Sequence, residues 1–72
     1  MKGAGRVRIK LNGEEKELAE ATTLRGLVEQ LALAPERLAV ELNQEVVRRA
    51  DWPSVVLSEG DRVEIVHFVG GG

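Results

Sequence analysis

One segment of this 72-residue chain repeats its apolar residues with the period of an α-helix, and it limits the folds that are possible. The apolar positions follow the i, i+3, i+4, i+7 pattern of a single buried stripe, and they are Leu24, Leu27, Val28 and Leu31. We expect Thr23 to cap the start of this helix, because a threonine hydroxyl accepts a hydrogen bond from a first-turn amide. Pro35 ends the helical region, because the residue before a proline disfavours the α conformation.

Segments with strand character flank the helix on both sides. The segment 6–11 alternates strictly between polar and apolar residues, which is typical of a half-buried strand. Asn12-Gly13 follows, the strongest short signal for a hairpin, and predicts a return strand at 14–18 anchored by Leu18. Further strands are expected at 38–42, 45–47 and 62–69, around an irregular stretch at 48–57.

The predicted order is strand, strand, helix, strand, strand, strand. A single helix can cover only one face of a sheet, so this order predicts an α+β roll. In that roll the one main helix packs across one face of a mixed sheet of four to five strands. We expect residues 6–69 to form a single domain, with 1–5 as a loose leader and 70–72 as a flexible Gly-Gly-Gly tail.

Length and composition exclude several classes of function. A chain this short buries only about 60% of the surface that it exposes when unfolded, which favours a small interaction or carrier domain over a self-sufficient enzyme. The 10 basic and 12 acidic residues give a net charge of −2, which does not suit nucleic acid, whose binding surfaces are strongly basic. The chain has no cysteine and no apolar run near the roughly 20 residues of a membrane span. We therefore expect a cytoplasmic protein without disulfides, thiolate nucleophiles or membrane contact.

Side chains suited to catalysis or metal binding are few. His67 is the only histidine, and its place on the same strand face as Ile65 favours packing at the rim of the core over a role as ligand or acid–base group. Ser54 and Ser58 show no Ser-His-carboxylate pattern, and the acidic residues of 14–20 are expected on a solvated surface. We expect no catalytic residue, no metal site and no bound cofactor.

Three consecutive glycines, Gly70, Gly71 and Gly72, directly follow an apolar run that ends at Val69. At an average glycine usage near 7%, three in a row at a given place arise by chance on the order of once in 3,000 sequences. Because glycine lacks a Cβ atom, Gly70 and Gly71 can thread a narrow channel. The α-carboxylate of Gly72 is ionised at neutral pH. The pattern predicts an arm whose carboxylate enters another protein's active site, where ATP would activate it as an acyl adenylate.

The last predicted strand also indicates a docking surface. Alternation points Val63 and Ile65 toward the helix and leaves Val66 and Phe68 on the opposite, exposed face. A valine and a phenylalanine exposed together beside a reactive terminus indicate a site for a partner protein.

Two segments resemble a known family. The segment 60–72, GDRVEIVHFVGGG, closely resembles the C-terminus of the ThiS family of thiamine-biosynthesis sulfur carriers, and the segment 39–47, AVELNQEVV, is similar to that family's central hairpin. The similarity extends over about residues 6–72. The sequence departs from the family at Gln44, where a glycine is common and where we expect turn strain.

This resemblance implies a ubiquitin-like β-grasp fold and a role as sulfur carrier in thiamine (thiazole) biosynthesis. The carboxylate of Gly72 would be adenylated with ATP by an E1-like adenylyltransferase of the ThiF type and converted to a thiocarboxylate. The sulfur would come from a cysteine desulfurase or another persulfide donor and would pass to a thiazole synthase of the ThiG type. The chain would then be a protein co-substrate rather than an enzyme, and ATP would be bound by the partner.

Three other functions stay open on the sequence. A sulfur carrier of the molybdopterin synthase type shares the terminal chemistry, although the run at 65–69 favours the thiazole branch. A ubiquitin-like protein modifier would join its terminal glycine to target lysines. An interaction module would carry the glycine tail without using it.

Overall fold

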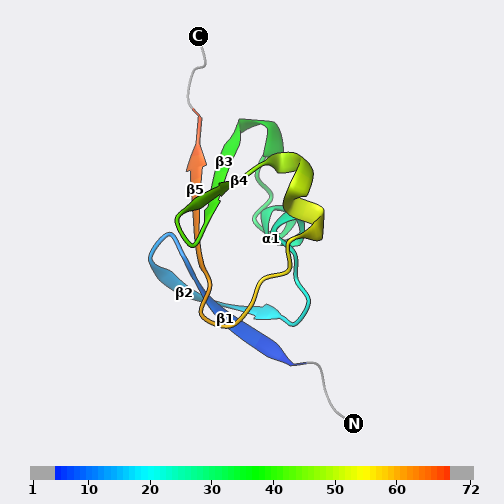
Figure 1. Cartoon of the computed structure of the whole chain (residues 1–72), viewed down its shortest axis with the longest axis vertical. Coiled ribbons are helices and arrows are strands. Elements are labelled where there is room, and N and C mark those ends of the chain that lie inside the picture. The colour runs from blue at the N-terminus through cyan, green and yellow to red at the C-terminus, as the bar shows by residue number, and fades with distance from the viewer. Residues whose placement is uncertain (1–4, 69–72) are drawn as a thin grey trace.

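The computed structural model describes residues 5–68. These residues form a five-stranded sheet with one α-helix packed across it (Figure 1). The elements in chain order are β1 (Arg6–Leu11), β2 (Glu14–Ala19), α1 (Leu24–Gln30), the 3-10 helix η1 (Pro35–Arg37), β3 (Leu38–Leu42), β4 (Glu45–Val47), the 3-10 helix η2 (Arg49–Ser54) and β5 (Arg62–His67). The strands lie in the order β2-β1-β5-β3-β4. β1 and β5 are parallel, and the other neighbours are antiparallel. The predicted α+β roll with a mixed sheet is confirmed.

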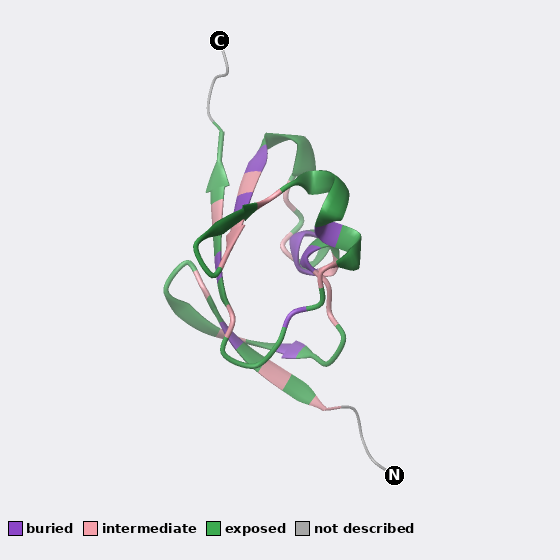
Figure 2. Cartoon of the chain, viewed as in Figure 1, coloured by how far each residue is buried: buried purple, intermediate pink, exposed green. Residues whose placement is uncertain are grey.

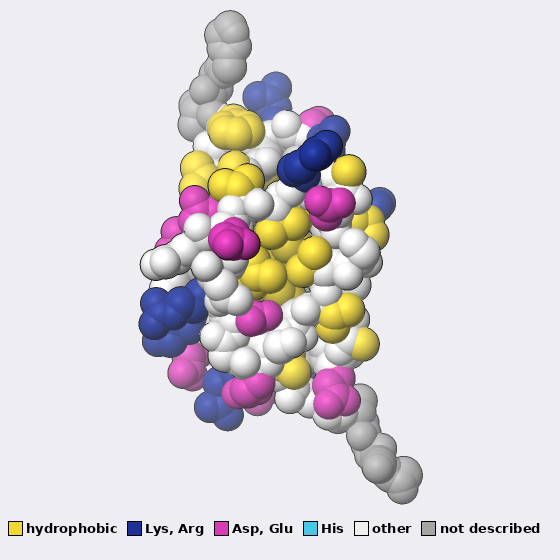
Figure 3. Space-filling view, in the orientation of Figure 1, with side chains coloured by type: hydrophobic (Ala, Val, Ile, Leu, Met, Phe, Trp, Pro, Cys, Tyr) yellow, Lys and Arg dark blue, Asp and Glu magenta, His cyan; other side chains and the backbone are white. Residues whose placement is uncertain are grey.

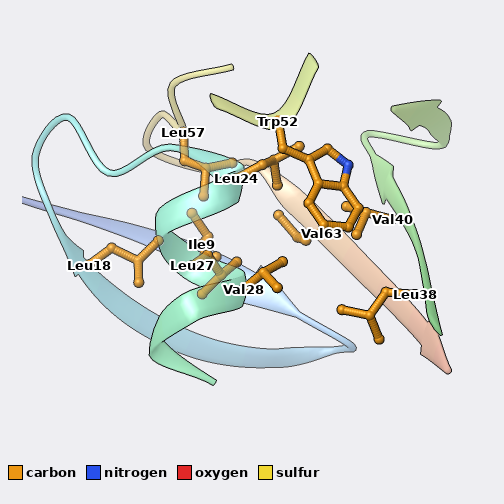
Figure 4. Close-up of a cluster of buried hydrophobic side chains, with 10 residues drawn as sticks. All are labelled: Ile9, Leu18, Leu24, Leu27, Val28, Leu38, Val40, Trp52, Leu57 and Val63. Carbon is orange, nitrogen blue, oxygen red and sulfur yellow. The ribbon is translucent and has the colours of Figure 1, made fainter. Parts of the chain in front are cut away.

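The core lies between α1 and the sheet face that it covers (Figure 2). The strand β5 crosses the middle of the sheet, and its Val63 has no exposed surface. Figure 4 shows the buried hydrophobic side chains, which are Ile9, Leu18, Leu24, Leu27, Val28, Leu38, Val40, Trp52, Leu57 and Val63. Leu24, Leu27 and Val28 of the predicted stripe and the anchor at Leu18 are therefore confirmed as core, and Leu31 is half-buried against it.

The helix α1 begins where the sequence predicts and ends earlier than the proline requires. The hydroxyl of Thr23 accepts a hydrogen bond from the Gly26 amide at 3.0 Å, which confirms the N-cap. Ala32 has a φ of 57°, in the left-handed region, so the chain leaves the helix before Pro35 is reached. No helix in the described part of the chain has the length and apolarity needed to cross a membrane.

The irregular stretch 48–57 contributes Leu57 to the core, as the sequence predicts for 55–57, and also Trp52, whose burial the sequence did not reveal. The side chain of Trp52, on η2, is 1% exposed, and its Nε1 atom donates a hydrogen bond to the Val47 carbonyl at 2.9 Å. A buried indole needs such a partner for its N–H group. Figure 4 shows the Trp52 ring beside Val40 among the buried side chains.

Two hairpin turns of the same geometry lie on either side of β5. Asn12 and Gly13 have φ values of 50° and 85°, and Asn43 and Gln44 have φ values of 52° and 73°. Positive φ at both central residues is the signature of the type I′ turn, which matches the twist of the flanking strands. Gln44 thus has the left-handed φ in which a side chain with a Cβ atom is unfavourable, so the turn strain at this position stays a prediction.

Candidate functional site

The two faces of β5 have different surroundings. Val63 lies in the core, and Ile65 is half-buried against it. Val66 and the residue that follows β5, Phe68, are each 56% exposed. The structure thus places these four side chains on the faces that the sequence predicts, and the docking role of Val66 and Phe68 stays a prediction.

An apolar surface surrounds the end of β5, which we call the outer patch and define as Ala39, Val46, Val66 and Phe68. Ala39 is the cross-strand partner of Val66, so both side chains lie on the same face of the sheet. Val46, on β4, is 69% exposed and continues this face toward the edge of the sheet. Figure 3 shows hydrophobic side chains gathered beside the end of the strand. Exposed apolar residues that cluster in this way mark a surface suited to a partner protein.

Two carboxylates border the outer patch. Glu41 and Glu64 are direct cross-strand partners on β3 and β5, and Glu41 also pairs with Val46 on β4. Like charges directly opposite each other do not stabilise a sheet. The pair gives the outer patch an acidic rim on one side.

The described chain reaches to within four residues of Gly72. The amide of Phe68 donates a hydrogen bond to the Arg37 carbonyl at 2.7 Å, so sheet-like pairing continues one residue beyond the end of β5. Gly70, Gly71 and Gly72 lie outside the described residues, as do the first four residues of the predicted leader. The predictions for these glycines, including threading and modification, are taken up as proposals below.

The asparagine of the first hairpin turn binds β5 in a way that the sequence did not reveal. The strands β1 and β5 pair at Lys10–Arg62 and Leu11–Val63. Beyond that point the backbone amide of Asn12 donates to the Val63 carbonyl at 2.9 Å. The Asn12 side chain then reaches Ile65: its Oδ1 atom accepts from the Ile65 amide at 2.8 Å, and its Nδ2 atom donates to the Ile65 carbonyl at 3.4 Å. The side chain extends the pairing on this side of β5.

Asn43, the asparagine of the second hairpin turn, also forms side-chain and backbone hydrogen bonds to β5, at the start of that strand. Its Oδ1 atom accepts from the Arg62 amide at 2.9 Å, and its backbone amide donates to the Arg62 carbonyl at 2.7 Å. The Nδ2 atom of Asn43 also donates to Oδ1 of Asp61 at 3.1 Å. Both turns use asparagine because it tolerates positive φ and carries a donor and an acceptor. That shared residue type was the one sequence signal for these contacts.

The remaining polar candidates do not assemble into a reactive site. His67 lies on the predicted face, but its packing was predicted wrongly: the side chain is exposed and lines a hollow of about 330 Å³ with Leu31, Leu33 and Leu38. It pairs with Leu38 at the last position of β5. Within residues 5–68 no three His, Asp or Glu residues converge on a point that could hold a metal ion.

The two serines have structural roles. The hydroxyl of Ser54 donates to the Asp51 carbonyl at 3.0 Å, inside η2. The amide of Ser58 donates to Oδ2 of Asp61 at 2.8 Å, in the turn that leads into β5. Neither serine contacts His67 in the hydrogen bonds of the described residues, so no nucleophile–base pair forms there.

Comparison with known proteins decides among the carriers and binding modules that share such a surface. The family model described as "ThiS family" matches residues 9–72, which is most of the chain and includes the glycine tail. The chain belongs to the ThiS family. This is a family of sulfur carriers of thiamine biosynthesis, and the match confirms the resemblance in the sequence.

Relatives and solved structures agree with this ThiS-family assignment. The chain is 35% identical to the sulfur carrier protein ThiS of Bacillus subtilis, over 89% of this chain and 98% of that protein. It resembles the crystal structure of the thiamine biosynthesis protein ThiS from Geobacter metallireducens with a TM-score of 0.80 and 33% identity, over 92% of this chain and all of that one. A ubiquitin from Caldiarchaeum subterraneum matches with a TM-score of 0.56 at 16% identity, which shows the ubiquitin-like β-grasp fold.

Some relatives of this ThiS-family chain are much longer. The chain is 50% identical to a thiazole synthase of Magnetococcus marinus over 66 residues, which are 92% of this chain and 20% of that protein. A second thiazole synthase, from Paramagnetospirillum magneticum, matches at 35% identity over the same share. The chain therefore spans about a fifth of the length of the thiazole synthases that it matches.

Proposed function

We propose that the chain carries sulfur on the carboxylate of Gly72 for thiazole formation and is a co-substrate of its partner enzymes rather than an enzyme. The observation that carries the proposal is the family match, which runs through the glycine tail to residue 72. The outer patch supports it, because a carrier must be recognised by proteins that act on its end.

The proposed chemistry begins with activation of a poor acylating group. A carboxylate oxygen of Gly72 attacks the α-phosphorus of ATP, and pyrophosphate leaves. The enzyme for this step is an E1-like adenylyltransferase of the ThiF type, which binds the ATP. A persulfide sulfur then attacks the acyl carbon and displaces AMP. Reduction of the resulting acyl disulfide by a thiol leaves the thiocarboxylate.

Each partner is proposed for a chemical reason. A cysteine desulfurase or another persulfide donor supplies sulfur, because this chain contains no cysteine to hold it. A thiazole synthase of the ThiG type accepts the sulfur, and the similarity to one fifth of two thiazole synthases supports this choice. These reactions run with free thiols, so we propose the cytoplasm as the location.

The outer patch is the proposed docking surface for these partners, with Val66 and Phe68 at its centre. Docking there holds the carrier while the glycines enter the partner. Gly70 and Gly71 are proposed to thread the entrance, because any side chain would widen the chain at that point. Apolar contact of this kind provides binding energy away from the reacting carboxylate, where it can be used to position the tail.

Intact-mass measurement tests the proposal. The purified chain is first weighed to establish that Gly72 carries a free carboxylate. It is then incubated with ATP, a ThiF-type enzyme and a persulfide donor with thiol. We expect a gain equal to the difference between one sulfur and one oxygen atom, located at residue 72 by fragmentation, and no gain when ATP or the donor is omitted.

The same measurement separates the alternative functions. Conjugates of higher mass that contain target lysines would indicate a protein modifier. An unchanged mass with every partner would indicate an interaction module. Transfer of the sulfur to a molybdopterin precursor, with none to a thiazole synthase, would indicate the other carrier type. Each of these outcomes overturns the thiazole assignment.

A further inference from the structure

We propose that Asn12 is a positioning residue for the chemistry at Gly72 and acts through the backbone of β5. The inference rests on the proposed function and adds a residue that lies outside both the tail and the outer patch. Its basis is the pair of hydrogen bonds from the Asn12 side chain to Ile65, which cross a separation of 53 residues in the sequence.

The two sides of β5 are supported unequally. On the β3 side, pairing runs from Leu42–Val63 to Leu38–His67 and continues with the Phe68 amide. On the β1 side, strand pairing stops at Leu11–Val63. The backbone of β1 turns away there into the hairpin, so the side chain of Asn12 holds β5 on that side at Ile65.

The position of this contact along the chain explains its importance. Ile65 is the residue from which β5 continues through Val66 and Phe68 toward the glycines. Seven residues separate it from Gly72, a distance of about 23–25 Å in extended chain. Reacting atoms must approach within about 3–3.5 Å in a defined direction. A strand that rotates freely about its β3 pairing would aim the tail over a wider range of directions, and fewer encounters would be productive.

Asn43 provides a matched comparison in the same molecule. It makes the same kinds of contact, with the carbonyl of its amide as acceptor for the Arg62 amide. Those contacts lie at the start of β5, on the side where pairing with β3 continues to the end of the strand. Losing them weakens the fold without freeing the end of β5. We therefore assign the aiming of the tail to Asn12 and not to Asn43.

The test uses glycine at each turn asparagine, because glycine keeps the positive φ and removes only the side chain. The kcat and KM of adenylation are measured by pyrophosphate exchange with a ThiF-type enzyme for the full chain. We expect Asn12→Gly to lower kcat about tenfold with KM within about twofold, because the outer patch is intact and the aim is lost. We expect Asn43→Gly to keep kcat and KM within about twofold of the wild-type values. Both glycine variants should lower the melting temperature by a similar amount, because each loses side-chain hydrogen bonds to β5.

A conservative variant and an exchange measurement complete the test. Asn12→Asp keeps an acceptor for the Ile65 amide and tolerates positive φ, so we expect it to restore most of the lost kcat. Amide hydrogen exchange of the wild-type chain should show Ile65 protected, and Asn12→Gly should speed exchange at Ile65. This exchange readout does not depend on any partner enzyme.

The outcomes separate the inference from the function on which it rests. Equal losses of kcat in the two glycine variants, or an unchanged kcat in Asn12→Gly, overturn the positioning role. Rapid hydrogen exchange of the Ile65 amide in the wild-type chain, at the rate of an exposed loop amide, also overturns the positioning role. This outcome can be observed even if Asn12→Gly does not fold. A wild-type chain that supports no exchange of pyrophosphate overturns the proposed function instead.

Discussion

Val63 and Val66 lie three residues apart on the same strand, and their surroundings are opposite. Val63 has no exposed surface and packs among the core residues, whereas Val66 is 56% exposed in the outer patch. The same residue type therefore serves the fold at one position and is available to a partner at the other. One face of β5 packs toward α1 and the opposite face is exposed (Figure 2), so this strand links the core to the surface beside the tail.

Deleting Gly72 should have the largest effect, and the effect should be on function alone. The deletion moves the carboxylate back by about 3.3–3.6 Å of extended chain, beyond the range in which the attack on ATP can occur. We expect pyrophosphate exchange with a ThiF-type enzyme to fall by more than about a hundredfold, with an unchanged melting temperature. Wild-type exchange by the shortened chain would overturn the carrier assignment.

Val63→Ala tests the buried face of β5. Removing two methyl groups from a fully buried site leaves a cavity, and we expect the free energy of unfolding to fall by about 2–3 kcal/mol. Chemical denaturation measures it. Val66→Ala is the matched control, and its free energy of unfolding should change by less than about 0.5 kcal/mol. If the two variants lose equal stability, the division between the faces is wrong.

Gly71→Val tests the proposed narrow entrance of the partner enzyme. The substitution keeps the carboxylate in place and adds a branched side chain next to it. We expect pyrophosphate exchange to fall about tenfold to a hundredfold, with no change in melting temperature. Gly70→Ala, one residue further from the chemistry, is the control and should be better tolerated. Wild-type exchange by Gly71→Val would remove the threading argument and leave the carrier assignment standing.

Phe68→Ala tests the exposed face. Truncating an aromatic residue at the centre of a docking surface commonly costs more than about 1 kcal/mol, so we expect kcat/KM for adenylation to fall about tenfold, mainly through a higher KM. The free energy of unfolding should stay within about 0.5 kcal/mol of the wild type. If kcat/KM is unchanged in a folded variant, the outer patch does not dock the partner through Phe68.

Gln44→Gly should have the smallest effect, and it should be favourable. Gln44 has a φ of 73°, where a Cβ atom costs about 1–2 kcal/mol and glycine has no such cost but loses more entropy on folding. We expect a net gain of about 0.5–1 kcal/mol in the free energy of unfolding and unchanged adenylation. Gln44→Ala keeps the Cβ atom and should show no such gain. A glycine variant no more stable than the wild type would mean that the turn carries no strain.

Local chemistry explains why so much of the fold could be predicted. Three signals each act over only a few residues and can be recognised in the sequence. They are the alternation at 6–11, the asparagine at each hairpin turn and the hydroxyl of Thr23. The predicted exposure of Val66 and Phe68 followed from the alternation of β5 in the same way. The tail was predicted from three consecutive glycines, a signal that can be recognised without knowing which residues lie near it in the fold.

Contacts between distant segments explain what could not be predicted. The stretch at 48–57 has no regular period, so nothing local indicated that Trp52 would be buried against Val47. His67 lies on the same strand face as the half-buried Ile65, yet its side chain is exposed at the last position of β5. The end of α1 was not predicted either, because Ala32 adopts a left-handed φ with no proline or glycine to signal it.

Local sequence signals predicted the strands, the helix, the two turns and the outward face of β5, because periodicity and turn chemistry are local properties, and the family followed from the resemblance at 39–47 and 60–72. The strand order and the burial of Trp52 depend on how distant segments pack together. The tertiary structure alone placed the side chains of Asn12 and Asn43 on β5, since those contacts join residues 53 and 19 positions apart. Asparagine at a turn looks the same in the sequence whether its side chain faces solvent or a neighbouring strand, and only the packed sheet brings that strand within reach of a hydrogen bond.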